Sequence, residues 1–228
     1  MNQRAFAAIF DWDGVIIDSS AAHERSWDIL AAEENRTLPE GHFKKGFGRK
    51  NEFIIPNILG WAHEPAEITR LANRKEELYR DIVRDTLKEP LPGVRALLSG
   101  LRDAGIPCAV GSSTHRANID LAMSLLGLRE FFQGIVTSED VKNGKPAPDV
   151  FLQSAASVGC APGAGVVFED ALAGVEAGLA GNFAVIAVAT TNTREVLETA
   201  KPTRIVHRLT EVNAELVRTL ALANRPTC

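Results

Sequence analysis

The sequence has few cysteines, no long apolar run and no basic stripe, and each shortage excludes a class of protein. Its three cysteines, Cys108, Cys160 and Cys228, lie far apart with no C-x-x-C pair, which argues against a zinc site or a redox dithiol. We interpret them as reduced thiols. The longest apolar run, residues 183–189, is far shorter than the ~18 residues that a membrane-spanning helix needs. No cleavable apolar segment precedes Asp11, so we expect a soluble, cytoplasmic protein with no membrane partner.

The charge balance also limits the partners. The 228 residues include 25 Lys and Arg against 29 Asp and Glu, a formal net charge of −4. Proteins that bind nucleic acid usually cluster basic residues against phosphates, so we expect no nucleic-acid partner. An apolar fraction of 45% with 24% charged residues is ordinary globular composition and argues against disorder, collagen and coiled coil. The length suits one domain with a large insertion, or two domains.

Short apolar runs alternate with helical patterns along most of the chain. The runs typical of strands are residues 6–10, 106–110, 135–137, 166–168 and 184–188. Apolar residues at helical spacing in 94–101 precede the run at 106–110, and those in 119–126 precede the run at 135–137. Strands that alternate with helices predict an α/β fold, a Rossmann-like parallel sheet with helices on both faces.

One long stretch breaks this alternation. Residues 15–92 contain helical patterns and no convincing strand, and they are bounded by Gly14 and by the turn-forming segment 90–93. We interpret them as a helical cap inserted after the first strand. The predicted division is therefore a catalytic core of residues 1–14 and 93–228, with the cap at 15–92.

Polar side chains follow three of the predicted strands at the point where each strand ends. Open parallel sheets bind their ligands at this edge, so these side chains would meet at one site if the strands are neighbours. A solvated loop would explain one such motif, but not three at the same edge. The residues are Asp11 and Asp13 after the first strand, Ser112, Ser113 and Thr114 after the second, and Glu169 and Asp170 after the fourth.

A fourth feature is Lys145, which lies before a helix predicted to begin near Asp149. An isolated lysine is usually a solvated surface charge, but here it could neutralise an anion. Together the four features resemble the motifs of the haloacid-dehalogenase superfamily of aspartate-nucleophile phosphotransferases. The segment between the first two motifs is similar to the small helical cap of its β-phosphoglucomutase and sugar-phosphatase branch. The matching residues, in motif order, are Asp11, Asp13 and Gly14, then Ser112, then Lys145, then Glu169 and Asp170.

The resemblance implies a role for each motif. Asp11 would attack phosphorus and become a phospho-aspartate, while Asp13 would protonate the leaving oxygen and later deprotonate water. Ser112 and Lys145 would hold the equatorial oxygens, where charge develops in the transition state. The superfamily's true dehalogenases lack the acid that Asp13 provides, so carbon–halogen cleavage is disfavoured.

A magnesium ion is the cofactor that the resemblance implies. Mg²⁺ prefers oxygen ligands and could bridge carboxylates to a phosphoryl oxygen. The expected ligands are Asp11, the backbone carbonyl of Asp13 and Asp170. Glu169 would act through a bound water.

Two cap residues are candidate substrate contacts. Lys75 falls inside the apolar stripe of a helix predicted to begin near Pro65. Its stem could simply follow the stripe to solvent, or its ammonium could meet an anion or a partner inside the cap. His23 shares a helix face with Trp27 and Leu30 and is a candidate partner, although a histidine among apolar residues is often a satisfied core group. The β-phosphoglucomutase branch is similar at both positions.

A glycine-containing basic loop, residues 44–49, lies between these two helices and suits a backbone that approaches a phosphate. Lys45, Gly46 and Arg49 match the mutase cap loop. Gly48 and Lys50 differ from it, and Arg116 replaces a common asparagine. The candidate substrate-binding residues are thus His23, Lys45, Gly46, Arg49, Lys75, Ser113, Thr114 and Arg116.

The predicted function is that of a Mg²⁺-dependent phosphatase of a small phosphorylated sugar or related metabolite, and we expect a monomer. One alternative is a hexose-phosphate mutase that shares the first half-reaction. Another is a binding or regulatory protein that kept the fold and lost catalysis. Because the acids, the lysine and the hydroxyl needed for chemistry are all present, the sequence favours an enzyme.

Overall fold

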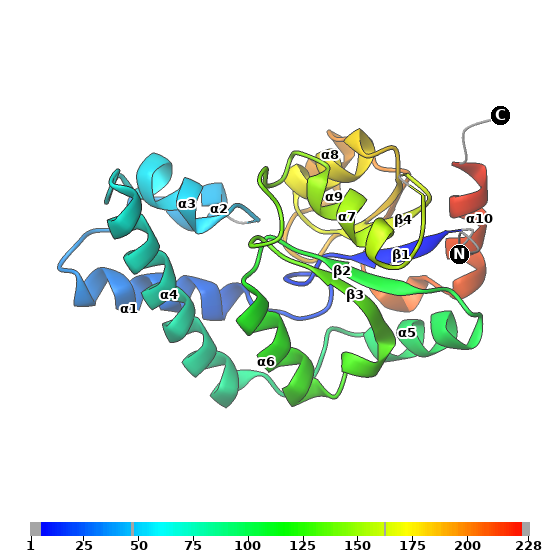
Figure 1. Ribbon diagram of the computed structural model, residues 1–228, viewed down its shortest axis with the longest axis horizontal. Coiled ribbons are helices and arrows are strands. Elements are labelled where there is room, and N and C mark those ends of the chain that lie inside the picture. Colours follow the sequence, from blue (N-terminus) through cyan, green and yellow to red (C-terminus); the bar gives the residue numbers. More distant parts are fainter. Residues whose placement is uncertain (1–5, 47, 162, 225–228) are drawn as a thin grey trace.

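A parallel sheet forms the centre of the computed structural model, which describes residues 6–46, 48–161 and 163–224 (Figure 1). Within these ranges the sheet has six strands in the order β3-β2-β1-β4-β5-β6, and every neighbouring pair is parallel. The predicted α/β fold is confirmed. The strands are β1 (Ala7–Phe10), β2 (Cys108–Gly111), β3 (Phe132–Val136), β4 (Gly165–Glu169), β5 (Ala184–Val188) and β6 (Arg204–Val206).

Five of these strands were predicted, with shifted ends. The run predicted at 106–110 begins as a strand only at Cys108, because Pro107 has no N–H to donate to a ladder. β6 was not predicted. It is short and at the edge of the sheet, and the apolar pair Ile205 and Val206 is too brief to stand out as a strand pattern.

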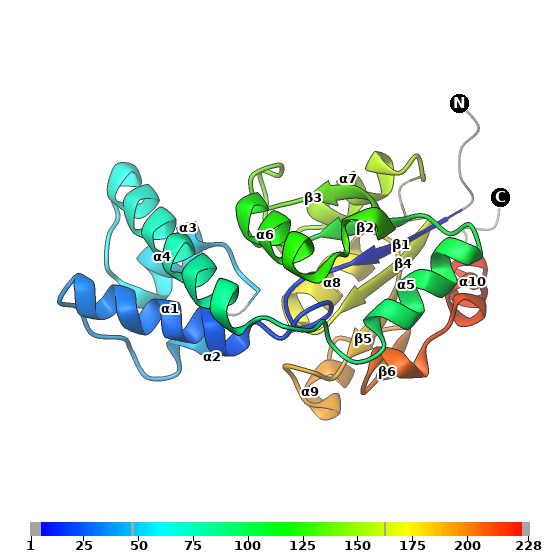
Figure 2. The same ribbon diagram turned by 90° about the horizontal axis from the view of Figure 1, so that it is seen from below.

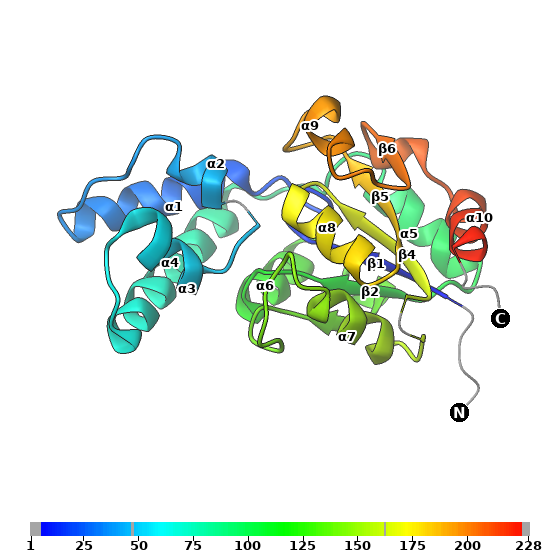
Figure 3. The same cartoon turned by 90° about the horizontal axis from the view of Figure 1, so that it is seen from above.

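Helices cover both faces of the sheet, as predicted. Successive residues of β1 alternate: Ala8 and Phe10 face one apolar cluster, and Ala7 and Ile9 face the other. The first cluster lies under α5 (Val94–Asp103), α6 (Arg116–Leu126) and α10 (Ala214–Ala223), in front in Figure 2. The second lies under α7 (Asp149–Ser157), α8 (Leu172–Ala180) and α9 (Arg194–Glu198), in front in Figure 3.

The segment after β1 folds into helices beyond one edge of the sheet (Figure 1). Its long helices pack on each other around Trp27, Leu30 and Leu71, and the predicted start near Pro65 is observed. Its described elements are α1 (Ser20–Glu33), α2 (His42–Gly46), α3 (Asn51–Ile54), the π-helix η1 (Ile55–Leu59) and α4 (Pro65–Thr86). Two 3₁₀ turns in the core complete the fold, η2 (Arg129–Phe131) and η3 (Leu209–Glu211).

The two connections between cap and core lie side by side. Val15, Ile16 and Ile17 pack in the apolar cluster of the sheet, so the chain leaves the core only after them. On the return, the Leu91 N–H donates to the Ile16 carbonyl at 2.9 Å. The division at 14/15 and 92/93 stays a prediction. No helix in the described ranges has the length and apolar character that a membrane crossing needs.

Candidate active site

The order of the strands brings the predicted motifs together. β1 lies between β2 and β4, so the residues that follow these three strands share one edge of the sheet. Asp11 follows β1, Ser112 follows β2, and Asp170 follows Glu169, the last residue of β4.

A buried lysine joins two of the acids. Lys145 Nζ lies 2.9 Å from Asp11 Oδ2 and 2.6 Å from Glu169 Oε1, and all three side chains are almost inaccessible to solvent. Burial lowers the pKa of Lys145, but the two carboxylates outweigh it and hold that pKa above its usual range. The lysine is therefore a fixed cation beside Asp11, and not a solvated surface charge.

Asp11 is held in place at both oxygens. Its Oδ1 accepts the backbone N–H of Trp12 at 2.7 Å, while Oδ2 meets Lys145. Burial, opposed by Lys145 and supported by the charges of Glu169 and Asp13, raises the pKa of Asp11 to about 7. A bound cation would favour its carboxylate form.

Asp170 has the features of a metal ligand. Both of its carboxylate oxygens are buried, and neither has a hydrogen bond of ordinary geometry within the described residues. Burial and the charges of Glu169 and Asp11 raise the pKa of Asp170 well above its usual range. A Cβ at Gly14, where φ is +74°, would lie 1.9 Å from Asp170 Oδ2, so this glycine makes room for the carboxylate.

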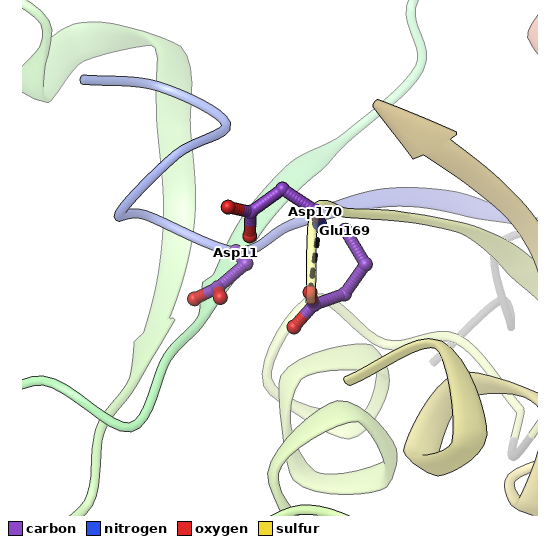
Figure 4. A group of neighbouring side chains, drawn as sticks. All are labelled: Asp11, Glu169 and Asp170. Atoms are coloured by element: carbon purple, nitrogen blue, oxygen red, sulfur yellow. Dashed lines mark hydrogen bonds between the residues drawn. The ribbon is translucent and has the colours of Figure 1, made fainter. Parts of the chain in front are cut away.

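Glu169 is placed differently from Asp170. Its Oε2 accepts the N–H groups of Asp170 and Ala171, both at 2.8 Å, and its Oε1 meets Lys145. Figure 4 shows its side chain bent back toward its own backbone, where a dashed line marks the bond from the Asp170 N–H. Both Glu169 oxygens therefore already have donors, which suits a residue that orients the site.

These acids fit a divalent cation. Ligand oxygens of Asp11, Glu169 and Asp170 lie within 4.8 Å of one another, and neither Asp170 oxygen has a hydrogen bond of ordinary geometry to another described residue. Hard oxygen donors of this kind suit Mg²⁺. Asp11 and Asp170 would hold the ion directly, with the predicted help of the Asp13 carbonyl, and Glu169 would act through a water.

Both carboxylate oxygens of Asp13 have polar neighbours. Its Oδ1 accepts from the Ser19 hydroxyl at 2.5 Å and lies 3.3 Å from His23 Nε2, while Oδ2 accepts from the Thr114 hydroxyl. Burial raises the pKa of Asp13, but His23 and the two hydroxyls outweigh it and hold that pKa well below its usual range. Asp13 is thus ionised in this state.

The two predicted cap residues meet in the structure. Lys75 Nζ lies 2.6 Å from His23 Nδ1, and the His23 ring stacks on Tyr79 with centroids 4.1 Å apart. An ammonium can only donate, so Nδ1 accepts and the ring proton must lie on Nε2, facing Asp13. The ammonium of Lys75 also forms an ion pair with Glu76 at 2.9 Å.

A cavity of about 60 Å³ lies between the acids Asp11 and Asp13 of the core and the cap. Its floor comes from the core, and its walls come mostly from the cap. The described core residues that line it are Asp11, Asp13, Ser112, Ser113 and Thr114. The described cap residues that line it are His23, Trp27, His42, Phe43, Gly46, Gly48, Arg49, Asn51, Ile54, Lys75 and Glu76.

Two predicted substrate residues lie outside this set of described lining residues. Lys45 is exposed on α2. Arg116 is also exposed, and its guanidinium lies beside Asp120 at 3.2 Å on the surface of α6. For Arg116 the reason is geometric, because an i,i+4 pair holds its side chain along the helix. Arg49 does line the cavity, and its guanidinium lies 4.7 Å from the centroid of the Phe53 ring.

Several residues of the site were not predicted. Ser19 donates to Asp13 from just before α1, and Asn51 and Glu76 line the cavity from the cap. Glu76 directly follows Lys75, so a buried lysine in an apolar stripe could have prompted a search for its counter-charge. Ser19 and Asn51 gave no comparable signal, because their roles depend on tertiary contacts.

The sequence profile of one family, described as haloacid dehalogenase-like hydrolase, matches residues 8–188. The chain belongs to this family. The match covers all four motifs of the hydrolase and every described cap helix.

Individual relatives are similar over most of this hydrolase. Hexitol phosphatase A of Escherichia coli is 39% identical over 185 residues, which cover 79% of this chain and 81% of the relative. The chloroplastic 5-amino-6-(5-phospho-D-ribitylamino)uracil phosphatase of Arabidopsis thaliana is 32% identical over 216 residues, or 94% of this chain but 57% of that protein. The crystal structure of β-phosphoglucomutase from Clostridium difficile superposes with a TM-score of 0.85 at 25% identity, covering 96% of this chain and 98% of that one.

Proposed function

We propose that this hydrolase is a Mg²⁺-dependent phosphatase of small phosphorylated sugars or sugar alcohols that works through an aspartyl-phosphate intermediate. The observation that carries the proposal is the pairing of two different acids at one cavity. Asp11 lies beside a fixed cation and the buried carboxylate of Asp170, whereas Asp13 lies beside a histidine and two hydroxyls. Their surroundings suit a nucleophile and a proton carrier respectively.

In the first step a carboxylate oxygen of Asp11 attacks phosphorus and forms an aspartyl phosphate. The bond from phosphorus to the sugar oxygen breaks, and that oxygen takes a proton from Asp13. Asp13 is ionised without substrate, but the negative charge of a bound phosphate raises the pKa of a nearby carboxyl group. Substrate binding therefore favours the protonated form that this step needs.

In the second step water attacks the phosphorus of the aspartyl phosphate. Asp13, again a carboxylate, accepts the proton of that water. The bond between phosphorus and the Asp11 oxygen breaks, which restores the Asp11 carboxylate and releases inorganic phosphate. The His23 Nε2–H holds the oxygen of Asp13 that lies 3.3 Å away. It thereby orients the proton carrier in both steps.

Two polar groups of the core can stabilise the negative charge that develops on the phosphoryl oxygens. Lys145 is already fixed beside Asp11, and Ser112 lies buried at the end of β2. Fixed donors of this kind stabilise a transition state without reorganising. When bound by Asp11, Asp170 and the Asp13 carbonyl, Mg²⁺ supplies Lewis-acid stabilisation of the transferring group.

The substrate class rests on the relatives and on the cavity. Hexitol phosphatase A and the ribitylamino-uracil phosphatase are both named for phosphorylated polyol groups. The cavity here offers hydrogen-bonding groups, Asn51, Lys75 and Glu76, beside the rings of Trp27 and Phe43. Such a mixture suits a hydroxylated chain with one apolar side.

The test is a panel of sugar and sugar-alcohol phosphates assayed for both free phosphate and isomerised product. We expect Mg²⁺-dependent phosphate release that a chelator abolishes. Asp11→Asn should remove turnover and also the gain in protein mass from the phosphoryl group in quenched samples. Full turnover by Asp11→Asn would refute the mechanism.

The second candidate is a sugar-phosphate mutase, which Arg49 favours. A mutase must bind a second phosphate opposite the aspartate, and a guanidinium at the cavity wall suits that phosphate. The likeness to β-phosphoglucomutase points the same way. Conversion of a sugar 1-phosphate into its 6-phosphate, with catalytic bisphosphate and little free phosphate, would establish this candidate over the phosphatase.

A further inference from the structure

Glu76 lines the cavity and neither attacks phosphorus nor carries a proton in the proposed chemistry, yet its carboxylate accepts several hydrogen bonds. Its side chain is only 4% exposed. Oε1 accepts from Lys75 at 2.9 Å and from the Asn51 amide at 2.7 Å, and Oε2 accepts from the Asn118 amide. The three donors come from α4, from the first residue of α3 and from α6.

The bond to Asn118 crosses from the cap to the core. Asn118 lies on α6, which begins two residues after Thr114 and packs on α4. Its amide nitrogen donates to Glu76, and its amide oxygen accepts from Arg80 Nη1 at 3.0 Å. Both the nitrogen and the oxygen of this buried core amide are therefore hydrogen-bonded to side chains of α4. These two bonds can form together only when α4 lies in this position against α6.

A continuous line of contacts runs from this junction to the proton carrier. Glu76 holds the ammonium of Lys75, Lys75 donates to His23 Nδ1, and His23 Nε2–H faces Asp13 Oδ1. Among the described residues, Glu76 is the one carboxylate within 4.0 Å of the Lys75 ammonium. A buried ammonium needs a counter-charge, so Glu76 is the partner that holds Lys75 in place against His23 Nδ1.

We propose that Glu76 is a positioning residue through which contact of the cap with Asn118 sets the Lys75–His23 pair against Asp13. The proposal rests on the proposed function, because Asp13 is taken as the proton carrier. When the cap is in place, Asn118 fixes one oxygen of Glu76 and Lys75 takes the other. The Lys75–His23 pair is thereby fixed against Asp13 by a contact between cap and core.

The leaving group provides the test. Glu76→Gln keeps the shape of the side chain and removes its charge, and Asn118→Ala removes only the core partner. Each variant is assayed with a sugar phosphate, whose leaving oxygen needs a proton, and with p-nitrophenyl phosphate, whose leaving group needs little help. Glu77→Gln is the control, because Glu77 is exposed on the next position of α4 and pairs with Arg74.

We expect Glu76→Gln to lower kcat/KM for the sugar phosphate by about 10-fold or more, and for p-nitrophenyl phosphate by less than about 3-fold. Asn118→Ala should show the same pattern with a smaller loss. The double variant should be no worse than Glu76→Gln alone, since both changes act through one link. Glu77→Gln should match the wild type on both esters.

Equal losses on the two esters, or additive losses in the double variant, would overturn the proposal and leave Glu76 a merely structural residue. A second readout does not depend on turnover. ¹⁵N NMR of the imidazole rings, with His23 assigned by its loss in His23→Gln, should show a proton on Nε2 in the wild type and an altered His23 signal in Glu76→Gln. Thermal unfolding of each variant confirms that it is folded.

The failure of the proposed function is distinguishable from the failure of this inference. A wild type that releases no phosphate from either ester refutes the phosphatase. The link through Glu76 is then decided by the NMR signal, and an unchanged His23 ring in Glu76→Gln refutes it. A wild type that is active, with a Glu76→Gln variant that is equally active on both esters, refutes the inference alone.

Discussion

Replacing the two neighbouring acids Glu169 and Asp170 should change stability in opposite directions. Glu169 is fully buried and accepts from Lys145 at 2.6 Å, so Glu169→Gln leaves a buried ammonium with one carboxylate fewer. Breaking a buried ion pair from one side destabilises by about 3 to 5 kcal/mol. In a chain of this size that corresponds to a loss of ~6 to 20 °C in Tm.

Asp170→Asn should do the reverse in the absence of metal. The Asp170 oxygens are buried with no hydrogen bond of ordinary geometry to another described residue, and burial together with nearby acids raises the pKa of Asp170. A carboxyl group whose pKa is raised on folding destabilises the protein at every pH above its ordinary pKa. A neutral amide removes that penalty, so the metal-free Tm should rise.

Added Mg²⁺ should then reverse the order of Tm between wild type and Asp170→Asn. At a concentration about 100 times its Kd, a ligand of the folded state stabilises by about 2.7 kcal/mol. Wild type should gain this, whereas Asp170→Asn should gain little and need about 100-fold more Mg²⁺ for activity. The assay is thermal unfolding with chelator and across a Mg²⁺ titration. A larger Mg²⁺ requirement in Glu169→Gln than in Asp170→Asn would refute the assignment of these two roles.

Three further outcomes are expected. Asp13→Asn should lower kcat for sugar phosphates by ~10²- to 10⁴-fold while sparing esters with good leaving groups, measured by phosphate release. Lys50→Ala removes the bonds that the cap loop donates to the carbonyls of Ser138 and Val141, the latter at 2.8 Å, and should raise KM without changing Tm much. Burial raises the pKa of Glu76, but the charge of Lys75 and the hydrogen bond from Asn51 act in the opposite direction, and that pKa is lowered to about 2. The stability that Glu76 adds should be full above pH 4.5 and lost as the pH falls toward 2, so urea unfolding of wild type and Glu76→Gln should converge there.

The sequence predicts the core of the fold well because its signals are local. Apolar runs mark the strands, and acids at their ends mark the edge where ligands bind. Lys145 shows the limit of this reasoning. Its place before a predicted helix allowed it to neutralise an anion, but its position beside Asp11 depends on a loop far along the chain, and the family resemblance was needed to assign it to this site.

The cap is harder to predict, because its residues act through tertiary contacts. Arg49 and Lys45 look equivalent as cations of one loop, yet only Arg49 lines the cavity among the described residues. Asn118 looks like an ordinary polar residue of α6, but it is 1% exposed and bonded to α4. A helical pattern predicts the helix face on which a residue lies, but it does not predict which side chains that face will contact.

The hydrogen bond between Leu91 and Ile16 has an evolutionary consequence. The segments that enter and leave the cap are joined by this hydrogen bond of 2.9 Å. The cap is therefore a loop whose two ends are already held together at the core. Such a segment can lengthen, shorten or be exchanged at little entropic cost to the sheet. New substrate preferences can therefore arise by rewriting the insertion, while the phosphoryl-transfer groups beneath it keep their positions.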